Sequence, residues 1–61
     1  MKKYELWNSN VEKLYETDDE LELNVTLATN YFTGNVCMIY QAEEKTIIEC
    51  ENYNIIINKG V

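Results

Sequence analysis

The sequence predicts an all-β fold, a small antiparallel meander or partly closed barrel of five to six strands. Apolar and polar residues alternate with a period of two in several short runs, which is the pattern of half-buried strands. Turn-forming residues separate these runs at the close intervals typical of a meander. The chain has 61 residues and therefore room for one small core, so we expect a single domain over residues 1–61.

The clearest alternation lies at Leu21, Leu23, Val25 and Leu27, which are interleaved with polar residues. Three later runs are rich in β-branched or aromatic residues, the composition that strands favour. They are residues 36–40, 46–50 and 55–57. Candidate turns fall at residues 8–10, 17–19, 33–35, 43–44 and 52–53. We therefore expect strands over all four runs.

The strand register follows from the turn positions, because a slip of one residue would move a whole strand to the other face. A turn centred on residues 43–44 places Cys37 opposite Cys50 and Ile39 opposite Ile48. We expect both cysteines to be buried there as free thiols, since a reducing compartment disfavours a bridge.

A turn centred on residues 52–53 places Cys50 opposite Ile55 and Ile48 opposite Ile57. Both turns then agree on one apolar face, and a three-residue loop at 33–35 adds the preceding strand to it. The predicted core face holds Val25, Leu27, Cys37, Ile39, Ile48, Cys50, Ile55 and Ile57.

The first twenty residues fit two structures. In the first, residues 4–7 and 12–15 form a hairpin, and a turn at residues 18–19 brings Leu14 opposite Leu23. In the alternative, an α+β fold, residues 3–16 form a helix packed on a four-stranded antiparallel sheet. Helical spacing supports it at Tyr4, Trp7, Val11 and Leu14, although the polar residues at 8–10 would disfavour a helix.

The charge of the chain predicts a protein partner with a basic surface. Eleven acidic residues against five lysines and no arginine give a net charge of −6, which disfavours direct binding to nucleic acid or to an anionic membrane. Most of the acids fall in two stretches of the sequence. The candidate acidic partner-binding residues are Glu16, Asp18, Asp19, Glu20, Glu22, Glu43, Glu44, Glu49 and Glu51.

Apolar residues on the predicted outer face form a second candidate surface. In the registers given above, all of them but Trp7 point away from the core, so something should cover them: the N-terminal segment with Trp7 and Tyr15, a second copy of the chain or a partner. The candidates for binding a partner, or for forming a homodimer, are Trp7, Val36, Met38, Tyr40, Ile47 and Ile56.

The residue inventory argues against catalysis and against a metal site. The chain has no histidine as a general base and no arginine to clamp an anion, and Ser9 is its one serine. The acidic residues lack the spacing of a calcium loop. We expect no enzyme activity, no metal and no cofactor. The longest apolar runs are too short to span a membrane, so we expect a cytoplasmic protein.

These expectations combine into one leading hypothesis. The chain is a small acidic binding protein, encoded by a phage or mobile element, that inhibits a host protein acting on nucleic acid. The alternative is a structural or assembly module, a small β domain that forms a homo-oligomer and inhibits nothing.

Overall fold

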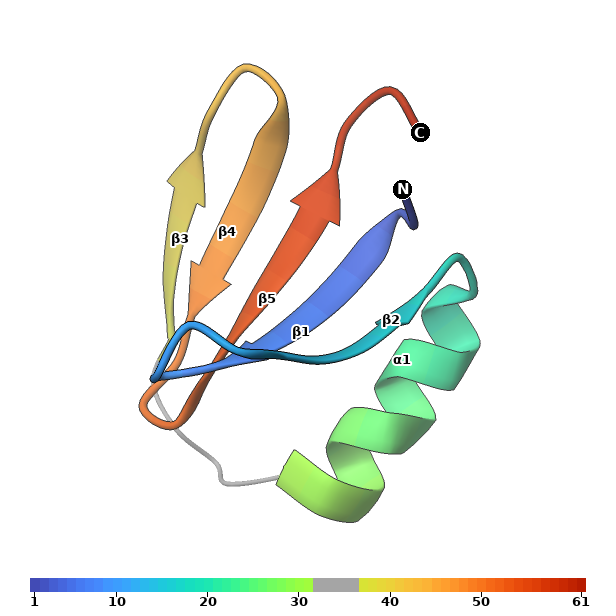
Figure 1. The fold of residues 1–61 in the computed structure, drawn as a ribbon, viewed down its shortest axis with the longest axis vertical. Coiled ribbons are helices and arrows are strands. Elements are labelled where there is room, and N and C mark those ends of the chain that lie inside the picture. Colours follow the sequence, from blue (N-terminus) through green and yellow to red (C-terminus); the bar gives the residue numbers. More distant parts are fainter. Residues whose placement is uncertain (32–36) are drawn as a thin grey trace.

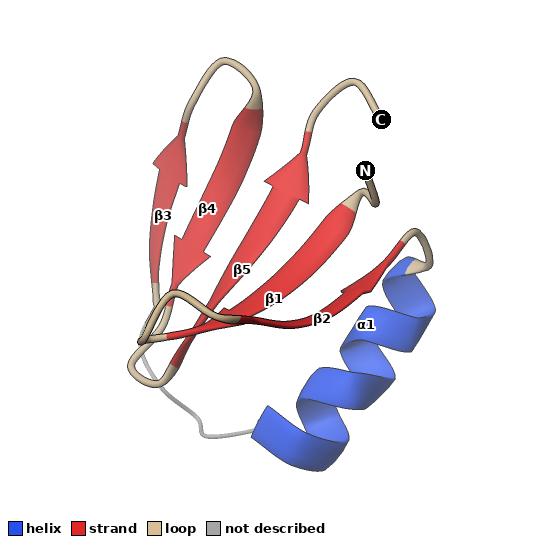
Figure 2. Ribbon diagram, in the orientation of Figure 1, coloured by secondary structure: helices blue, strands red, loops and turns tan. Residues whose placement is uncertain are grey.

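The computed structural model describes residues 1–31 and 37–61. The elements in chain order are β1 (Tyr4–Asn8), β2 (Lys13–Thr17), α1 (Glu20–Thr26), η1 (Leu27–Tyr31), β3 (Met38–Gln41), β4 (Lys45–Glu49) and β5 (Tyr53–Asn58). The π-helical turn η1 continues α1. Five antiparallel strands form one sheet in the order β2-β1-β5-β4-β3, which is not closed into a barrel (Figure 1; Figure 2). The predicted antiparallel meander is confirmed.

The β3–β4 hairpin has the predicted register. Ile39 lies opposite Ile48, and the Ala42 N–H donates to the Lys45 carbonyl at 2.9 Å, which closes the turn at residues 43–44. The turn prediction succeeded because the two acidic residues interrupt two β-branched runs of similar length.

The β4–β5 hairpin differs from its predicted register by two residues. Ile48 lies opposite Ile55, and the Cys50 N–H donates to the Tyr53 carbonyl at 2.9 Å. The turn therefore occupies residues 51–52, and the predicted pairings of Cys50 with Ile55 and of Ile48 with Ile57 are wrong. A shift of two preserves the direction of every side chain, so the predicted faces of both strands remain correct.

The N-terminal hairpin is confirmed, and the alternative helix over residues 3–16 is wrong. Leu6 lies opposite Tyr15 and Trp7 opposite Lys13, so Leu14 is the extra residue of a bulge. Leu14 is 43% exposed, and the predicted contact with Leu23 does not form in a sheet.

Residues 21–27 form a helix, so the strand predicted there is wrong. The carboxylate of Asp19 caps α1 by accepting from the N–H groups of Leu21 and Glu22, at 2.9 and 3.4 Å. Acidic residues in the first turn also favour a helix start. The alternation misled because Leu21 and Val25 are exposed, while Leu23 is buried.

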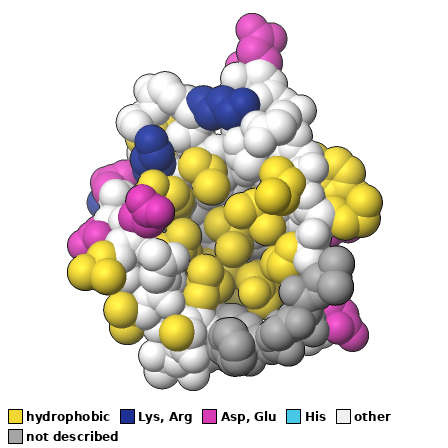
Figure 3. Space-filling model, turned by 180° about the vertical axis from the view of Figure 1, so that it is seen from behind, with side chains coloured by type: hydrophobic (Ala, Val, Ile, Leu, Met, Phe, Trp, Pro, Cys, Tyr) yellow, Lys and Arg dark blue, Asp and Glu magenta, His cyan; other side chains and the backbone are white. Residues whose placement is uncertain are grey.

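The core lies between α1 and the sheet. Leu6 is fully buried, and Leu23 and Ile55 pack with it. The partly buried residues around them are Tyr4, Tyr15, Leu27, Ile48, Tyr53 and Ile57. Figure 3 views the helix side of the sheet, where apolar side chains gather over the middle. The hydroxyls of Tyr15 and Thr17 both donate to Glu22, which fastens α1 to β2.

Cys37 and Cys50 form a disulfide, so the prediction of free thiols is wrong. Their predicted juxtaposition is correct. Their Cα atoms are 4.3 Å apart, close to the separation of about 4.5 Å between non-hydrogen-bonded partners on antiparallel strands. Such positions bring two sulfurs within bonding reach. The strand register could predict that the two cysteines lie opposite each other, but it could not predict whether they are bonded.

The predicted turn at residues 33–35 and the candidate Val36 lie outside the described residues. None of the helices among the described residues has the length and apolar character needed to cross a membrane.

Candidate binding surface

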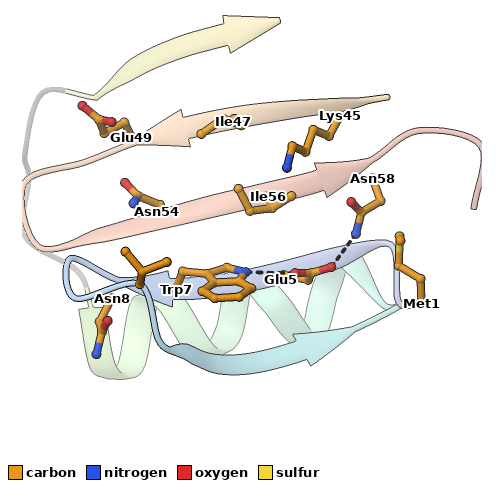
Figure 4. Close-up of a pocket in the computed structure, with 11 residues that line it drawn as sticks. Met1, Glu5, Trp7, Asn8, Lys45, Ile47, Glu49, Asn54, Ile56 and Asn58 are labelled. Atoms are coloured by element: carbon orange, nitrogen blue, oxygen red, sulfur yellow. Dashed lines mark hydrogen bonds between the residues drawn. The ribbon is translucent and has the colours of Figure 1, made fainter. Parts of the chain in front are cut away.

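The candidate site is a hollow on the open face of the sheet, the face opposite α1 (Figure 4). Alternate residues of β1, β5 and β4 point to this side, because side chains of a strand alternate between the two faces. The hollow has a volume of about 550 Å³. It is lined by Met1, Glu5, Trp7, Asn8, Val11, Lys45, Ile47, Glu49, Asn54, Ile56 and Asn58.

Three polar side chains are fixed to one another at one end of this hollow. The Trp7 indole N–H donates to Glu5 Oε1 at 2.9 Å, and the Asn58 amide donates to Glu5 Oε2 at 2.7 Å. The same Asn58 nitrogen donates to the Lys2 carbonyl at 2.8 Å. Figure 4 shows Glu5 between its two donors. Both carboxylate oxygens are thus engaged, and the indole ring is held over the sheet.

The charge state of Glu5 follows from these contacts. Partial burial of the carboxylate by itself would raise its pKa. The hydrogen bonds from Asn58 and Trp7, together with attraction to Lys13 and Lys45, outweigh that effect and lower the pKa of Glu5 below its usual value. The hollow therefore holds a fixed negative charge at neutral pH.

Trp7 has a cation near its ring. The Lys13 ammonium lies 6.0 Å from the ring centroid, at the outer limit of a cation–π contact, and also pairs with Glu16 at 3.1 Å. Trp7 remains only half-buried. A large aromatic side chain held in place and partly open to solvent is the kind of residue that anchors an interface.

Val11 lies at the rim of the hollow in an unfavourable backbone conformation. Its φ is 62°, in the left-handed region that β-branched residues rarely adopt. The turn imposes this value: Asn8 Oδ1 accepts from the N–H groups of Asn10 and Glu12, each at 2.9 Å. The Val11 side chain is 78% exposed, so burial does not compensate for the strain.

The structure brings most of the predicted apolar surface together. Trp7, Ile47 and Ile56 line the hollow. Tyr40 lies opposite Ile47 on the neighbouring strand, and its hydroxyl approaches the Met38 sulfur at 3.6 Å, so both β3 residues extend the same open face. We refer to these five residues as the apolar surface.

The predicted acidic residues are all exposed, but they do not form one surface. Glu43 and Glu44 precede β4, whereas Glu49 and Glu51 lie at its other end, separated by a strand of five residues, or about 17 Å. Glu20 and Glu22 both lie on α1 and not on a strand. Across residues 1–31 and 37–61, no three Asp, Glu or Cys side chains gather as a metal site would require.

Three residues of the first acidic stretch of the sequence make contacts within the fold. Asp18 accepts from the Lys3 N–H at 2.9 Å and pairs with the Lys2 ammonium at 3.5 Å. These contacts lower the pKa of Asp18, with the backbone hydrogen bond as the larger cause. Asp19 caps α1, and Glu22 accepts from β2. These three carboxylates therefore stabilise the fold itself.

Glu49 is the one predicted acidic residue that lines the hollow. Glu5, Lys45, Asn54 and Asn58 also line it but were not predicted as site residues. Glu5 was not predicted because it lies outside the two acidic stretches of the sequence. Asn54 and Asn58 alternate with Ile56, and this period of two was the available signal that they share its face.

Comparisons with known proteins found no relative. No protein-family model matches the chain, and neither a curated protein nor a solved structure matches it at a significant level.

Proposed function

We propose that this chain is a protein-binding protein and that the open face of its sheet is the contact surface. One observation carries the proposal: the apolar surface of Trp7, Met38, Tyr40, Ile47 and Ile56 lies on one side of the sheet, next to polar groups held by hydrogen bonds. Aromatic and methionine side chains at the centre with polar groups around them are typical of protein interfaces.

The shape of the site favours a protein over a small molecule. Small-molecule sites enclose most of their ligand, and they are usually deep clefts. Here the hollow is open on the side of the sheet that α1 does not cover. The same face of the sheet continues beyond the hollow to the exposed Met38 and Tyr40 of β3. A partner with a protruding apolar side chain would fill it beside the Trp7 indole.

The negative charge of the chain favours a partner with a basic surface. With a net charge of −6, the chain attracts a basic surface, of the kind found on proteins that act on nucleic acid. Glu49 supplies an acid at the hollow itself, and Glu43, Glu44 and Glu51 supply charge at the ends of β4. We therefore propose that the partner is a host protein that handles nucleic acid, and that a phage or mobile element encodes this chain to inhibit it.

This proposal places the chain in the cytoplasm, where the reducing environment disfavours disulfides. The chain nevertheless carries the Cys37–Cys50 disulfide. Binding should therefore be measured with the oxidised and the reduced protein.

The test is affinity capture from a bacterial lysate, followed by titration of the purified captured protein against variants. Trp7→Ala and Ile56→Thr should each weaken binding by about tenfold or more, because both remove apolar contact area. Leu21→Ala is the matched control, since Leu21 is exposed on α1, on the other side of the sheet. Circular dichroism confirms the fold of each variant. Equal affinities for all three variants and the parent would refute the proposed surface.

The role of charge needs a separate experiment. Glu43→Lys with Glu44→Lys, and Glu49→Lys with Glu51→Lys, should lower the association rate and weaken binding most at low salt, because exposed charges steer encounter. The acids at 18, 19 and 22 are unsuitable, since their reversal would remove structural contacts. An affinity that changes with neither salt nor charge would leave the apolar surface as the sole determinant and refute the basic partner.

A further inference from the structure

The side of α1 that faces away from the sheet carries two exposed apolar residues. Leu21 and Val25 are 69 and 57% exposed, and they lie four positions apart, so they share one side of the helix. Each is two positions from Leu23, or about 200° around the helix, and Leu23 is the residue that α1 buries against the sheet. Helix α1 is therefore apolar on two opposite sides, of which its own sheet covers one. We refer to Leu21 and Val25 as the outer stripe.

The helix also leaves part of the sheet uncovered. A helix about 10 Å across spans two or three strands, because neighbouring strands lie about 4.8 Å apart. Glu22 fastens α1 to β2, and Leu23 packs with Leu6 of β1 and Ile55 of β5. In Figure 1 the helix lies at the β2 end of the five-stranded sheet. Within the described residues, the helix side of β4 and β3 therefore has no helix over it.

This uncovered part of the sheet has the composition of a buried surface. Its residues are Ile39, Gln41, Thr46 and Ile48, which form two cross-strand pairs on the helix side. Ile39 is 64% exposed. The charged residues of β3, β4 and β5 are Lys45 and Glu49, and both line the hollow on the open face. Apolar side chains are open to view over the middle of the helix side (Figure 3). A strand face without charge is typical of one that packs against another layer.

We propose that two copies of this chain dimerise through their helix sides, with α1 of each copy covering β4 and β3 of the other. The outer stripe then packs on Ile39 and Ile48 of the second copy. The twofold axis lies between the two sheets and parallel to the strands, because an axis across the strands would place both helices over the same end of the sheet. Each helix is buried between two sheets, and the two helices lie side by side in one layer.

The dimensions and the charge of the molecule predict a small, weak interface. The side that faces the second copy extends 29 by 22 Å, or about 600 Å², against about 800 Å² for each partner in a standard interface. We therefore expect dissociation in the micromolar range. Two copies with a net charge of −6 repel each other, and salt screens this repulsion. The dimer should tighten as the salt concentration rises, whereas binding to a basic partner should weaken.

The dimer leaves the proposed partner surface free. The hollow lies on the open face of the sheet, opposite α1, so the hollows of the two copies face outward in opposite directions. Two partner molecules could bind one dimer. The dimer does not depend on the proposed function, because the two proposals use opposite sides of the sheet.

Sedimentation equilibrium over a series of protein concentrations, at low and high salt, tests the dimer. Val25→Lys and Ile39→Lys should each raise the dissociation constant by about tenfold or more, because each puts a charge into an apolar contact. This loss should occur although both changes reduce the repulsion between copies. Val11→Lys is the matched control, since it makes the same exchange at an exposed valine on the rim of the hollow and should leave the dimer intact. Circular dichroism confirms the fold of each variant.

Intermolecular NMR contacts identify the interface. In a mixture of labelled and unlabelled chains, the Val25 methyl groups of one copy should contact the Ile39 side chain of the other. A protein that stays monomeric at every concentration overturns the dimer, and so does a dimer that Val25→Lys and Ile39→Lys leave unchanged. A dimer in which Val25 contacts only Val25 of the second copy overturns it as well.

A last pair of measurements separates this dimer from the proposed function. Val25→Lys should leave the affinity for the captured partner unchanged, because Val25 lies on α1 and not on the open face. Trp7→Ala should leave the dimer intact, because Trp7 lines the hollow. Failure of the dimer and failure of the proposed function are thus distinguishable.

Discussion

The Asn58 amide donates to the Glu5 carboxylate at 2.7 Å, a hydrogen bond that joins residues 53 positions apart in the sequence. It ties the last strand to the first on the open face of the sheet. Asn58 is 6% exposed, and its backbone N–H also donates to the Lys3 carbonyl, at 2.7 Å. This buried amide therefore connects the two chain ends with the hollow.

Asn58→Ala should destabilise the protein by about 1 to 3 kcal/mol, because it removes the donor to Glu5 Oε2 and to the Lys2 carbonyl. Urea denaturation measures the loss. Asn54→Ala on the same strand and face is the control, and it should cost less, since Asn54 is only half-buried. A variant at 58 as stable as the parent would show that water replaces the amide.

Stability should fall in acid partly through Glu5. Its pKa is lower in the folded state than the 4.5 of the free carboxyl, so the ionised form stabilises the fold above about pH 4.5. This contribution is lost as the pH falls through the folded-state pKa. Thermal unfolding of the parent and of Glu5→Gln, followed from neutral pH into acid, should show two curves that converge at low pH. Parallel curves would contradict the assignment to Glu5.

Reduction of the disulfide should destabilise the protein by about 3 kcal/mol, the loop-closure value for a bridge across 13 positions. Urea denaturation with and without a dithiol reductant measures the difference. The double variant Cys37→Ala with Cys50→Ala is the control, because its stability should not depend on the reductant. If the parent also gives the same stability in both conditions, the bridge does not form in solution.

Val11→Asn should stabilise the protein by about 1 kcal/mol, because asparagine accepts the left-handed conformation that valine resists. Thermal denaturation measures the gain. Since Val11 lines the hollow, the same change should weaken partner binding. The matched control is Val61→Asn, an exposed valine for which no such gain is expected. A stability loss in Val11→Asn would show that the valine side chain compensates for its strain.

Local patterns in the sequence determined the hairpins. The acidic pair at residues 43–44 interrupts two β-branched runs, and this alone placed Ile39 opposite Ile48. The period of two assigned Ile47 and Ile56 to the open face even where the β4–β5 turn was displaced, because a shift of two residues leaves the faces unchanged. The net charge of −6 and the lack of histidine and arginine were likewise plain from composition.

Tertiary structure alone decided the rest. The alternation of Leu21, Leu23, Val25 and Leu27 is that of a strand. The segment is nevertheless a helix, because it covers Leu6 and Ile55 of the sheet and because Asp19 caps its first turn. Packing overrides a short local pattern because burial of one face is worth more than strand propensity. The hollow at Glu5 also depends on a contact between opposite ends of the chain, to which no local pattern extends.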